Sequence, residues 1–276
     1  MTEPLEPIPA ATNVVLRAGP HVVRSERRPV ESVRWEHELL EFLAREVPEV
    51  VAPVRARDDT TFLARAEHIV SVFPYVEGEH IERLDERIRA RLPEVLGRMH
   101  RRATAWPVNR QRPAQPSFRE LDWETNLWWD RRLVDATPVL EDAFDKTREW
   151  VAHAPPLTVC AIHGDFHPGN VLAVDGRITG VLDWSFARLD WPAFDLASIV
   201  GVLALQKDGS VEADAAEGVI ATYANAGGPG EPDAVMPLVR LYLLAVSLFS
   251  LTRRARGESW NPEIVALMER GLAKLG

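Results

Sequence analysis

The sequence predicts an α+β protein with two parts, a small antiparallel β region with one helix and a larger, mainly helical region. Short β-prone runs separated by turn residues fill residues 13–76 around one amphipathic helical stretch. Beyond Gly78 the pattern is mainly helical. The exception is a pair of apolar runs joined by Asp175-Gly176, which predicts a β-hairpin. We therefore expect an N-terminal lobe over residues 1–76 and a C-terminal lobe over residues 77–276.

The composition is that of an ordinary globular protein and excludes several functions. The 276 residues are 46% hydrophobic and 26% charged, enough for one large or two modest domains. A net charge of −9 argues against nucleic-acid binding, which needs clustered Lys and Arg. No signal peptide is visible, and the longest apolar stretch, Leu241–Leu251, is too short to span a bilayer. We expect a cytoplasmic protein without a membrane or nucleic-acid partner, in which the single Cys160 is a buried, inert thiol.

The predicted strands of the N-terminal lobe are short, and turn residues separate them. In chain order they are Asn13–Ala18, His21–Ser25, Val50–Val54, Thr60–Ala64 and Ile69–Val76. Gly19-Pro20 between the first two predicts a hairpin. The segment Phe73–Val76 is expected to connect the two lobes.

Pro29–Val47 is expected to form the one helix of this lobe, with Ser32 as its N-cap. Glu36 shares a helical face with Leu39, Leu40 and Leu43. A carboxylate on an apolar face needs a partner when it is buried. Arg24 on the preceding strand is the nearest candidate, and the alternative is that Glu36 lies in water at the edge of the face.

The C-terminal lobe is predicted to hold a series of helices. They are Ile81–Ala103, kinked or restarted at Pro93, then Pro138–His153, Pro192–Leu205, Val211–Asn225, Pro232–Arg256 and Pro262–Leu275. His100 lies one turn after Leu96 on an apolar face, where a hydrogen-bonded core histidine is a more common finding than a metal ligand.

The stretch 157–183 contains the candidate catalytic and metal-binding residues. If Asp175 and Gly176 form a two-residue hairpin loop, Asn170 lies opposite Val181 and Asp183 is its diagonal neighbour. Asp165 lies in the loop that leads into the first strand. Two carboxylates and a carboxamide then meet at one end of the hairpin, and such hard oxygen ligands suit Mg²⁺.

Two other interpretations of this stretch stay open. Asp, Asn, Gly and Pro are also ordinary loop residues. A metallophosphatase would contain similar fragments at Gly164-Asp165 and Gly169-Asn170, but it needs further His and Asp ligands, and no second His cluster follows. The joint spacing of His163, Asp165 and Asn170, followed by a hairpin that ends in an Asp, is instead typical of the catalytic loop and metal aspartate of protein kinases.

The sequence resembles the aminoglycoside phosphotransferase family, the small-molecule branch of the protein-kinase-like two-lobe fold. The resemblance rests on residues 163–172 (HGDFHPGNVL), 180–184 (GVLDW) and 195–197 (DLA). Weaker matches lie at residues 22–24, 35–40 and 99–100, so it covers most of the chain. Relatives carry a longer N-terminal strand and a nucleotide-covering loop before the equivalent of Asn13, whereas here only about a dozen residues precede it and they form no Gly-rich loop.

The resemblance implies a role for each matching residue. Asp165 would be the catalytic base or would orient the acceptor hydroxyl, and Asn170 and Asp183 would hold Mg²⁺ against the nucleotide phosphates. Arg24 would contact phosphate and Glu36 would brace it. The donor would be ATP or GTP, and the nucleotide-binding residues implied are Arg24, Glu36, Ser71, Phe73 and Tyr75. Asp195, His163 and His167 would be structural.

The family implies the reaction, phosphoryl transfer to a small hydroxylated molecule, and leaves the acceptor open. The net charge of −9 favours a cationic acceptor, such as an aminoglycoside or basic peptide antibiotic. Asp190, Asp122 and Glu124 are the candidate contacts, because acidic groups beside Trp residues bind ammonium groups. Two alternatives remain: a kinase of a metabolite such as homoserine, choline or a sugar, and a catalytically weak kinase-like binding protein.

Overall fold

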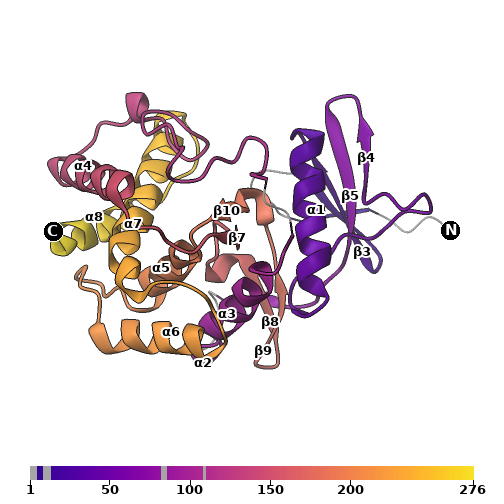
Figure 1. Ribbon diagram of the computed structural model, residues 1–276. Helices are drawn as coiled ribbons and strands as arrows, with labels where there is room; N and C mark the ends of the chain where they lie inside the picture. Colours follow the sequence, from indigo (N-terminus) through magenta and orange to yellow (C-terminus); the bar gives the residue numbers. More distant parts are fainter. Residues whose placement is uncertain (1–4, 9–13, 82–85, 108–109) are drawn as a thin grey trace.

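The computed structural model describes residues 5–8, 14–81, 86–107 and 110–276. Figure 1 shows a small lobe of strands with the long helix α1 beside a larger lobe of helices, as the sequence predicts. The chain leaves the N-terminal sheet at the end of β5 (His68–Pro74) and reaches the hairpin of the other lobe in β6 (Glu79–His80). The division between residues 76 and 77 stays a prediction.

The N-terminal lobe contains a five-stranded antiparallel sheet in the order β1-β2-β3-β5-β4. Besides β5, its strands are β1 (Glu6–Pro7), β2 (Val14–Ala18), β3 (His21–Glu26) and β4 (Phe62–Arg65). The hairpin around Gly19-Pro20 is confirmed, while Asn13 lies outside the described residues. The prediction of a strand at Val50–Val54 is wrong: Val50 makes one isolated bridge to Val181, and residues 51–55 form no strand.

Helix α1 (Val30–Ala44) covers one side of this sheet. Glu36, Leu39, Leu40 and Leu43 are all buried, as their spacing predicts. The prediction that Ser32 caps the helix is wrong, because α1 begins two residues earlier, after Pro29. Ser32 is buried inside the first turn, where its hydroxyl accepts a hydrogen bond from Arg112.

The predicted hairpin is present as β8 (Val171–Val174) and β9 (Arg177–Val181), with β6 paired to β8 on the other side. Asp175 and Gly176 both have positive φ, 48° and 75°, as a two-residue turn of the mirror-image type requires. The predicted register is wrong by one residue. A bulge between Leu172 and Ala173 places Val171 opposite Val181.

The C-terminal lobe is built mainly of helices. They are α2 (Glu86–Arg89), α3 (Leu92–Ala103), α4 (Pro138–His153), α5 (Pro192–Leu203), α6 (Ala213–Asn225), α7 (Pro232–Ala255) and α8 (Pro262–Leu275). β7 (Cys160–Ile162) and β10 (Arg188–Asp190) form a short two-stranded sheet, and Cys160 is buried. Pro93 stands in the first turn of α3, so the helix restarts there; residues 82–85 lie outside the described residues.

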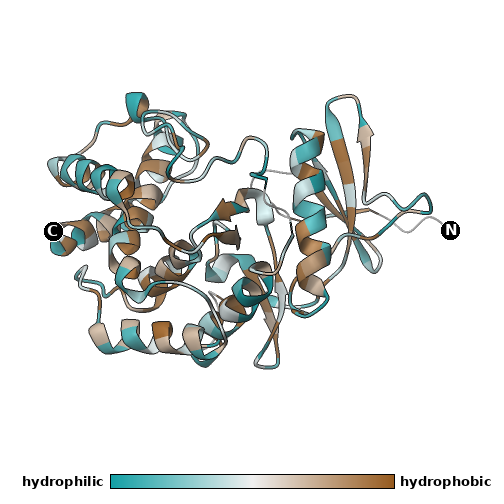
Figure 2. Cartoon of the chain, viewed as in Figure 1, coloured by the Kyte–Doolittle hydropathy of each residue, from teal (hydrophilic) through white to brown (hydrophobic). Residues whose placement is uncertain are grey.

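Helix α7 is long and apolar enough to cross a membrane by length and composition. In this fold it packs against α4, α5 and α8, and half of its apolar window is buried by them. Figure 2 shows brown, apolar residues on the helices of this lobe. The composition of α7 is therefore accounted for by its place in the core of the helical lobe.

Candidate active site

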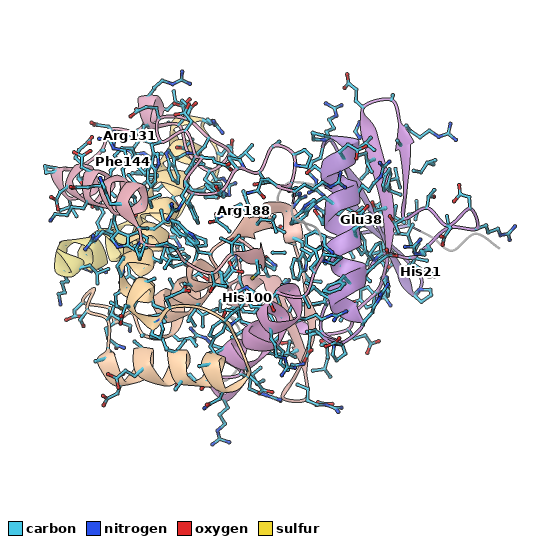
Figure 3. The ribbon with its side chains drawn as sticks, viewed as in Figure 1. His21, Glu38, His100, Arg131, Phe144 and Arg188 are labelled. Carbon is cyan, nitrogen blue, oxygen red and sulfur yellow. The ribbon has the colours of Figure 1, made fainter. Side chains whose placement is uncertain are left out.

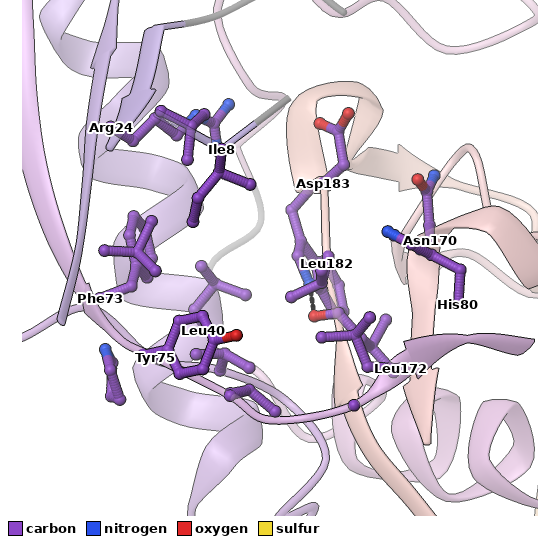
Figure 4. Close-up of a pocket in the computed structure, with 18 of the residues that line it drawn as sticks. Ile8, Arg24, Leu40, Phe73, Tyr75, His80, Asn170, Leu172, Leu182 and Asp183 are labelled. Atoms are coloured by element: carbon purple, nitrogen blue, oxygen red, sulfur yellow. Dashed lines mark hydrogen bonds between the residues drawn. The ribbon is translucent and has the colours of Figure 1, made fainter. Parts of the chain in front are cut away.

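A cavity of about 470 Å³ lies between the two lobes. Val22, Arg24 and Phe73 reach it from the N-terminal sheet, and Asn170 and Asp183 reach it from the hairpin of the other lobe. In Figure 4 the Arg24 side chain comes from the sheet, and Asp183 and Asn170 stand on the opposite wall. A cleft of this size, apolar over most of its walls with charged groups at one end, is typical of a small-molecule site.

Glu36 is buried and anchors a cluster of arginines at the charged end of this cavity. Its carboxylate accepts hydrogen bonds from Arg24 at 3.3 Å, Arg28 at 2.6 Å and Arg112 at 2.6 Å. Burial alone would raise the pKa of Glu36, but the charges of Arg28, Arg24 and Arg112 outweigh it and hold the pKa well below its ordinary value. The predicted pairing of Arg24 with Glu36 is confirmed.

Arg112 comes from the segment that follows α3 and is itself buried. Besides Glu36 it donates to the carbonyl oxygens of Trp184, Ser185 and Ala187, at 2.8, 3.2 and 3.1 Å. Its guanidinium group therefore joins α1 of the N-terminal lobe to the segment that directly follows Asp183. Burial lowers the pKa of Arg112 to about 10, with Glu36 opposing the shift, so the group is charged at neutral pH.

Of the three other residues that were expected to contact the nucleotide, two line the cavity and one does not. Phe73 and Tyr75 line the cavity. Ser71 does not, because helix α1 covers that part of the sheet: His37 packs edge-on against Phe62 and Phe73, and Ser71 is the direct partner of Phe62. The expectation that Ser71 offers groups to a nucleotide is corrected. Tyr75 also uses its backbone N–H in a hydrogen bond to Pro20.

Asp165 is held in its loop by the residues around it. Asp195 is buried and accepts from the backbone N–H groups of His163 at 2.8 Å and Gly164 at 2.9 Å, which confirms its expected structural role. Asn170 donates to the backbone oxygen of Asp165 at 2.9 Å and to its carboxylate at 3.2 Å. The Asp165 carboxylate is therefore fixed by its direct contact with Asn170.

His100 and His163 are core histidines, as expected. His100 binds Tyr223 at 2.9 Å and Asp195 at 3.2 Å. His163 is buried, and its Nε2 lies 2.9 Å from the carbonyl oxygen of Leu182. These contacts tie the Asp165 loop to α3, α5 and the end of the hairpin at once (His100 is labelled in Figure 3).

Asp183 follows Leu182, whose N–H donates to the carbonyl oxygen of Asn170 at 2.8 Å. One residue past a strand partner, a side chain would normally point to the opposite face. Asp183 avoids this because its backbone is left-handed, with φ 56° and ψ 71°. Its Oδ1 accepts from the Ser185 hydroxyl at 2.5 Å, and the same hydroxyl accepts from Arg24 at 3.0 Å.

The oxygens of Asn170 and Asp183 fit a hard cation. Asn170 donates through its amide nitrogen, so its Oδ1 has no hydrogen bond among the described residues. Asp183 uses Oδ1 and leaves Oδ2 without a hydrogen bond in the same part of the chain. Both residues line the cavity, which matches the oxygen donors that Mg²⁺ prefers.

Asp165 lines a second, smaller cavity of about 100 Å³. Gly164 and Asp165 line it together with aromatic rings from several segments and residues of α7. Asp165 thus belongs to the smaller cavity and Asn170 to the larger one. The hydrogen bond between these two side chains therefore links the linings of the two cavities.

The three acidic residues expected to face an acceptor do not line this second cavity. Asp190 is buried, and its carboxylate accepts hydrogen bonds from Arg188 at 2.8 Å and from the N–H groups of Phe118 and Trp191, both at 3.0 Å. The expectation for Asp190 is therefore corrected. Asp122 is exposed and accepts from the N–H groups of Glu124 and Thr125, and Glu124 is exposed too.

Sequence reasoning missed Arg112 and Ser185. Arg112 lies in a Pro/Arg-rich stretch without periodicity, and its partner Glu36 is 76 residues away, so no local pattern marks it. Ser185 carried a usable signal. An Asp-x-Ser sequence predicts a turn in which the Ser N–H and hydroxyl bind the Asp, and this is the geometry found here.

Two lobes with a charged cleft between them, and a catalytic-type loop followed by a hairpin, define a kinase-like protein. Residues 5–238 match the model of the phosphotransferase enzyme family, and the chain belongs to this family. The expected protein-kinase-like fold is confirmed by solved structures: an amicoumacin kinase in complex with AMP-PNP and Ca²⁺ superimposes with a TM-score of 0.73, at 14% identity over 98% of this chain and 87% of that one.

Two further similarities concern sequence as well as fold. The macrolide 2′-phosphotransferase of Brachybacterium faecium is 26% identical, with a TM-score of 0.59 over 100% of this chain and 92% of that one. Homoserine kinases of Chelativorans sp. (strain BNC1) and Parvibaculum lavamentivorans are 26% and 27% identical over 73% of this chain. The chain covers 60% and 62% of the length of these two curated relatives.

Proposed function

We propose that this protein transfers the γ-phosphoryl group of ATP to a hydroxyl group of a small molecule. The observation that carries the proposal is the hydrogen bond that links the linings of the two cavities. Asn170 and Asp183 line the larger one, Asp165 lines the smaller one, and Asp165 and Asn170 are hydrogen-bonded at 3.2 Å. A donor on one side and an acceptor on the other would meet at this bond.

The residues take the following roles in the proposed reaction. Arg24, held by Glu36, contacts phosphate oxygens in the larger cavity, and Phe73 and Tyr75 contact the base. Asn170 and Asp183 would hold Mg²⁺, which neutralises charge on the phosphates. The acceptor oxygen forms a bond to the γ-phosphorus, the bond from phosphorus to the bridging oxygen breaks, and ADP leaves. Asp165 orients the acceptor hydroxyl and takes its proton.

In such a site most of the catalysis comes from the positions and charges of the side chains, and neighbouring residues hold the proposed catalytic side chains of this protein in place. Asp165 is fixed through Asn170, and Asp183 is fixed through Ser185. The Glu36 cluster holds Arg24 at the mouth of the same cavity.

GTP is the alternative donor, and the protein is expected to act in the cytoplasm.

The acceptor class has two candidates. Relatives named homoserine kinases favour a small metabolite. The macrolide phosphotransferase, similar over the whole chain, favours an antibiotic. A cationic antibiotic stays a prediction that rests on the net charge of −9, since Asp165 is the one carboxylate of the described chain that lines the acceptor cavity.

The test measures conversion of ATP and GTP to diphosphates against a panel of hydroxylated amines, amino acids, macrolides and sugars. Asp165→Asn is expected to lower kcat by about 100-fold or more, because it removes the proton acceptor, and to change the KM for the nucleotide by less than about twofold. Asp175→Asn, in the exposed hairpin turn, is the matched control and should behave like wild type. An Asp165→Asn variant with more than about a tenth of wild-type kcat would overturn the role of Asp165.

A further inference from the structure

The chemistry of the smaller cavity limits what it can bind. Phe118, Trp128, Phe186 and Phe194 form one wall, and α7 forms the other. Apart from Asp165, no described residue that lines the cavity is charged. Walls of this kind bind the apolar surface of a ligand, while a few polar groups set its orientation.

The four rings of the aromatic wall pack against one another. The ring centroids of Phe118 lie 4.5 Å from Phe194 and 5.4 Å from Trp128, and Trp128 lies 5.9 Å from Phe186. Phe118 is fully buried. On the facing helix, Phe249 is 37% exposed, so the cavity reaches the surface on that side. These ring contacts hold the wall in place, and the slot opens to solvent.

Aromatic rings near a carboxylate can also bind an ammonium group, and Arg188 argues against that here. Its guanidinium group lies 4.5 Å from the ring centroid of Phe118 and 4.6 Å from that of Trp128. Its guanidinium group also lies 5.7 Å from the ring centroid of Phe194, so three of the four rings already interact with a cation. Arg188 is buried, and it is labelled in Figure 3. A second cation in the slot would be repelled by Arg188, although its partner Asp190 offsets part of this charge.

Tyr242 supplies the second polar group of the slot. Its ring packs against Gly201, where a Cβ atom would lie 2.7 Å from the ring, so α5 fixes its position. Burial raises the pKa of the Tyr242 hydroxyl, and the charge of Asp165 raises it further, so the hydroxyl is protonated and can donate. In the described part of the chain this hydroxyl has no hydrogen-bond partner, which leaves it available to a ligand.

We propose that the smaller cavity binds the acceptor through an uncharged, apolar face next to the reacting hydroxyl, and not through an ammonium group. This inference rests on the phosphotransferase function proposed above and names its substrate class. Asp165 accepts the proton of the reacting hydroxyl, and Tyr242 donates to a neutral oxygen of the same molecule. An ammonium group elsewhere on the acceptor would lie outside the aromatic slot.

The test compares two probes of the same shape, 3,3-dimethylbutan-1-ol and choline. The alcohol has a neutral carbon atom where choline has its positively charged nitrogen. Saturation-transfer NMR on the whole protein with Mg²⁺ and ADP measures their binding without turnover. The alcohol is expected to give a signal about fivefold or more above that of choline, and the signal should not change between about 20 and about 300 mM salt. Stronger binding of choline, or no binding of the alcohol, would overturn the proposal.

Two variants establish that the signal comes from this cavity. Ala245→Phe fills the slot and should remove the alcohol signal, whereas Ala255→Phe, exposed at the end of the same helix, should not. If Ala245→Phe does not fold, Phe249→Ala at the partly exposed wall should weaken binding by about threefold to tenfold. An unchanged signal in the folded variants would overturn the assignment. Because no step requires turnover, failure of phosphoryl transfer itself is detected separately.

Discussion

The guanidinium group of Arg112 donates to the carboxylate of Glu36 across 2.6 Å, and both side chains are almost completely buried. The same guanidinium group contacts three carbonyl oxygens in the segment just after Asp183. The five N–H donors of a planar guanidinium group can bind the carboxylate and the carbonyl oxygens at once, whereas the compact ammonium group of a lysine cannot. The position of Asp183, the proposed metal ligand, is thereby coupled to that of helix α1.

Arg112→Lys is expected to lower the free energy of unfolding by about 2–4 kcal/mol, because carbonyl oxygens in the core lose their donors. It should also raise the KM for the nucleotide several-fold, since Asp183 and Arg24 lose their common support. Urea unfolding and steady-state kinetics measure the two effects. Arg110→Lys, in the same segment but exposed and 3.6 Å from an exposed Glu38, is the control and should change neither quantity. A wild-type KM in Arg112→Lys would contradict the coupling.

Ser185→Ala is expected to raise the Mg²⁺ concentration needed for half-maximal activity several-fold. Its hydroxyl fixes Asp183 at 2.5 Å and accepts from Arg24 at 3.0 Å, so its loss frees the carboxylate to turn away from the cavity. Stability should change by less than about 1 kcal/mol, because the residue is only half-buried. Ser210→Ala is the matched control: Ser210 binds Asp208 in the same way, at 2.6 Å, on the surface of the same lobe, and lines neither cavity. Equal Mg²⁺ curves for both variants would refute this role of Ser185.

Asn170→Ala and Asp183→Ala should each raise the Mg²⁺ requirement, with the larger effect for Asp183→Ala. A carboxylate compensates the charge of the ion, and a carboxamide does not. If both hold one ion, the double variant should lose less activity than the two single effects combined. Mg²⁺ titrations of nucleotide turnover test this. Additive effects would mean that the residues act on separate species.

The elements that the sequence predicts well are those with a local cause. The turn at Asp175-Gly176 follows from two residues that accept positive φ, and the helical face of Glu36 follows from the spacing of Leu39, Leu40 and Leu43. The contact of Asp165 with Asn170 also has a local cause, because both residues lie in one contiguous stretch. Asp183 lies one hairpin further on and lines the same cavity as Asn170.

The predictions that are wrong concern positions whose structure depends on residues far away in the sequence. The hairpin register shifts by one residue at a bulge, and the N–H of Val181 donates to the carbonyl oxygen of Glu49, just before the segment that was expected to be a strand of the N-terminal lobe. Asp190 was assigned to the acceptor because it follows Asp183 closely, but it is buried and accepts a hydrogen bond from the backbone N–H of Phe118, 72 residues away in the chain. Periodicity and motif spacing contain no information on either contact.

His37 makes the stability of the N-terminal lobe depend on pH. Its ring is buried between Phe62 and Phe73, and its Nδ1 lies 2.9 Å from the Thr61 hydroxyl. Burial lowers the pKa of His37 to about 4, and the charges of the neighbouring arginines act in the same direction, against the opposing effect of Glu36. The folded protein therefore holds this imidazole neutral at a pH where the unfolded chain protonates it.

Since the pKa of His37 is lower in the folded state than its ordinary value of 6.5, the unfolded chain binds more protons between these two pKa values. The free energy of unfolding is therefore expected to fall as the pH is lowered from about 6.5 to about 4, by about 3 kcal/mol from this group. His37→Gln keeps a polar partner for Thr61 and cannot titrate, so its urea unfolding should lose less stability over the same interval. The difference between the two proteins isolates His37 from other titrating groups. Parallel stability curves for wild type and His37→Gln would show that His37 is not the group responsible.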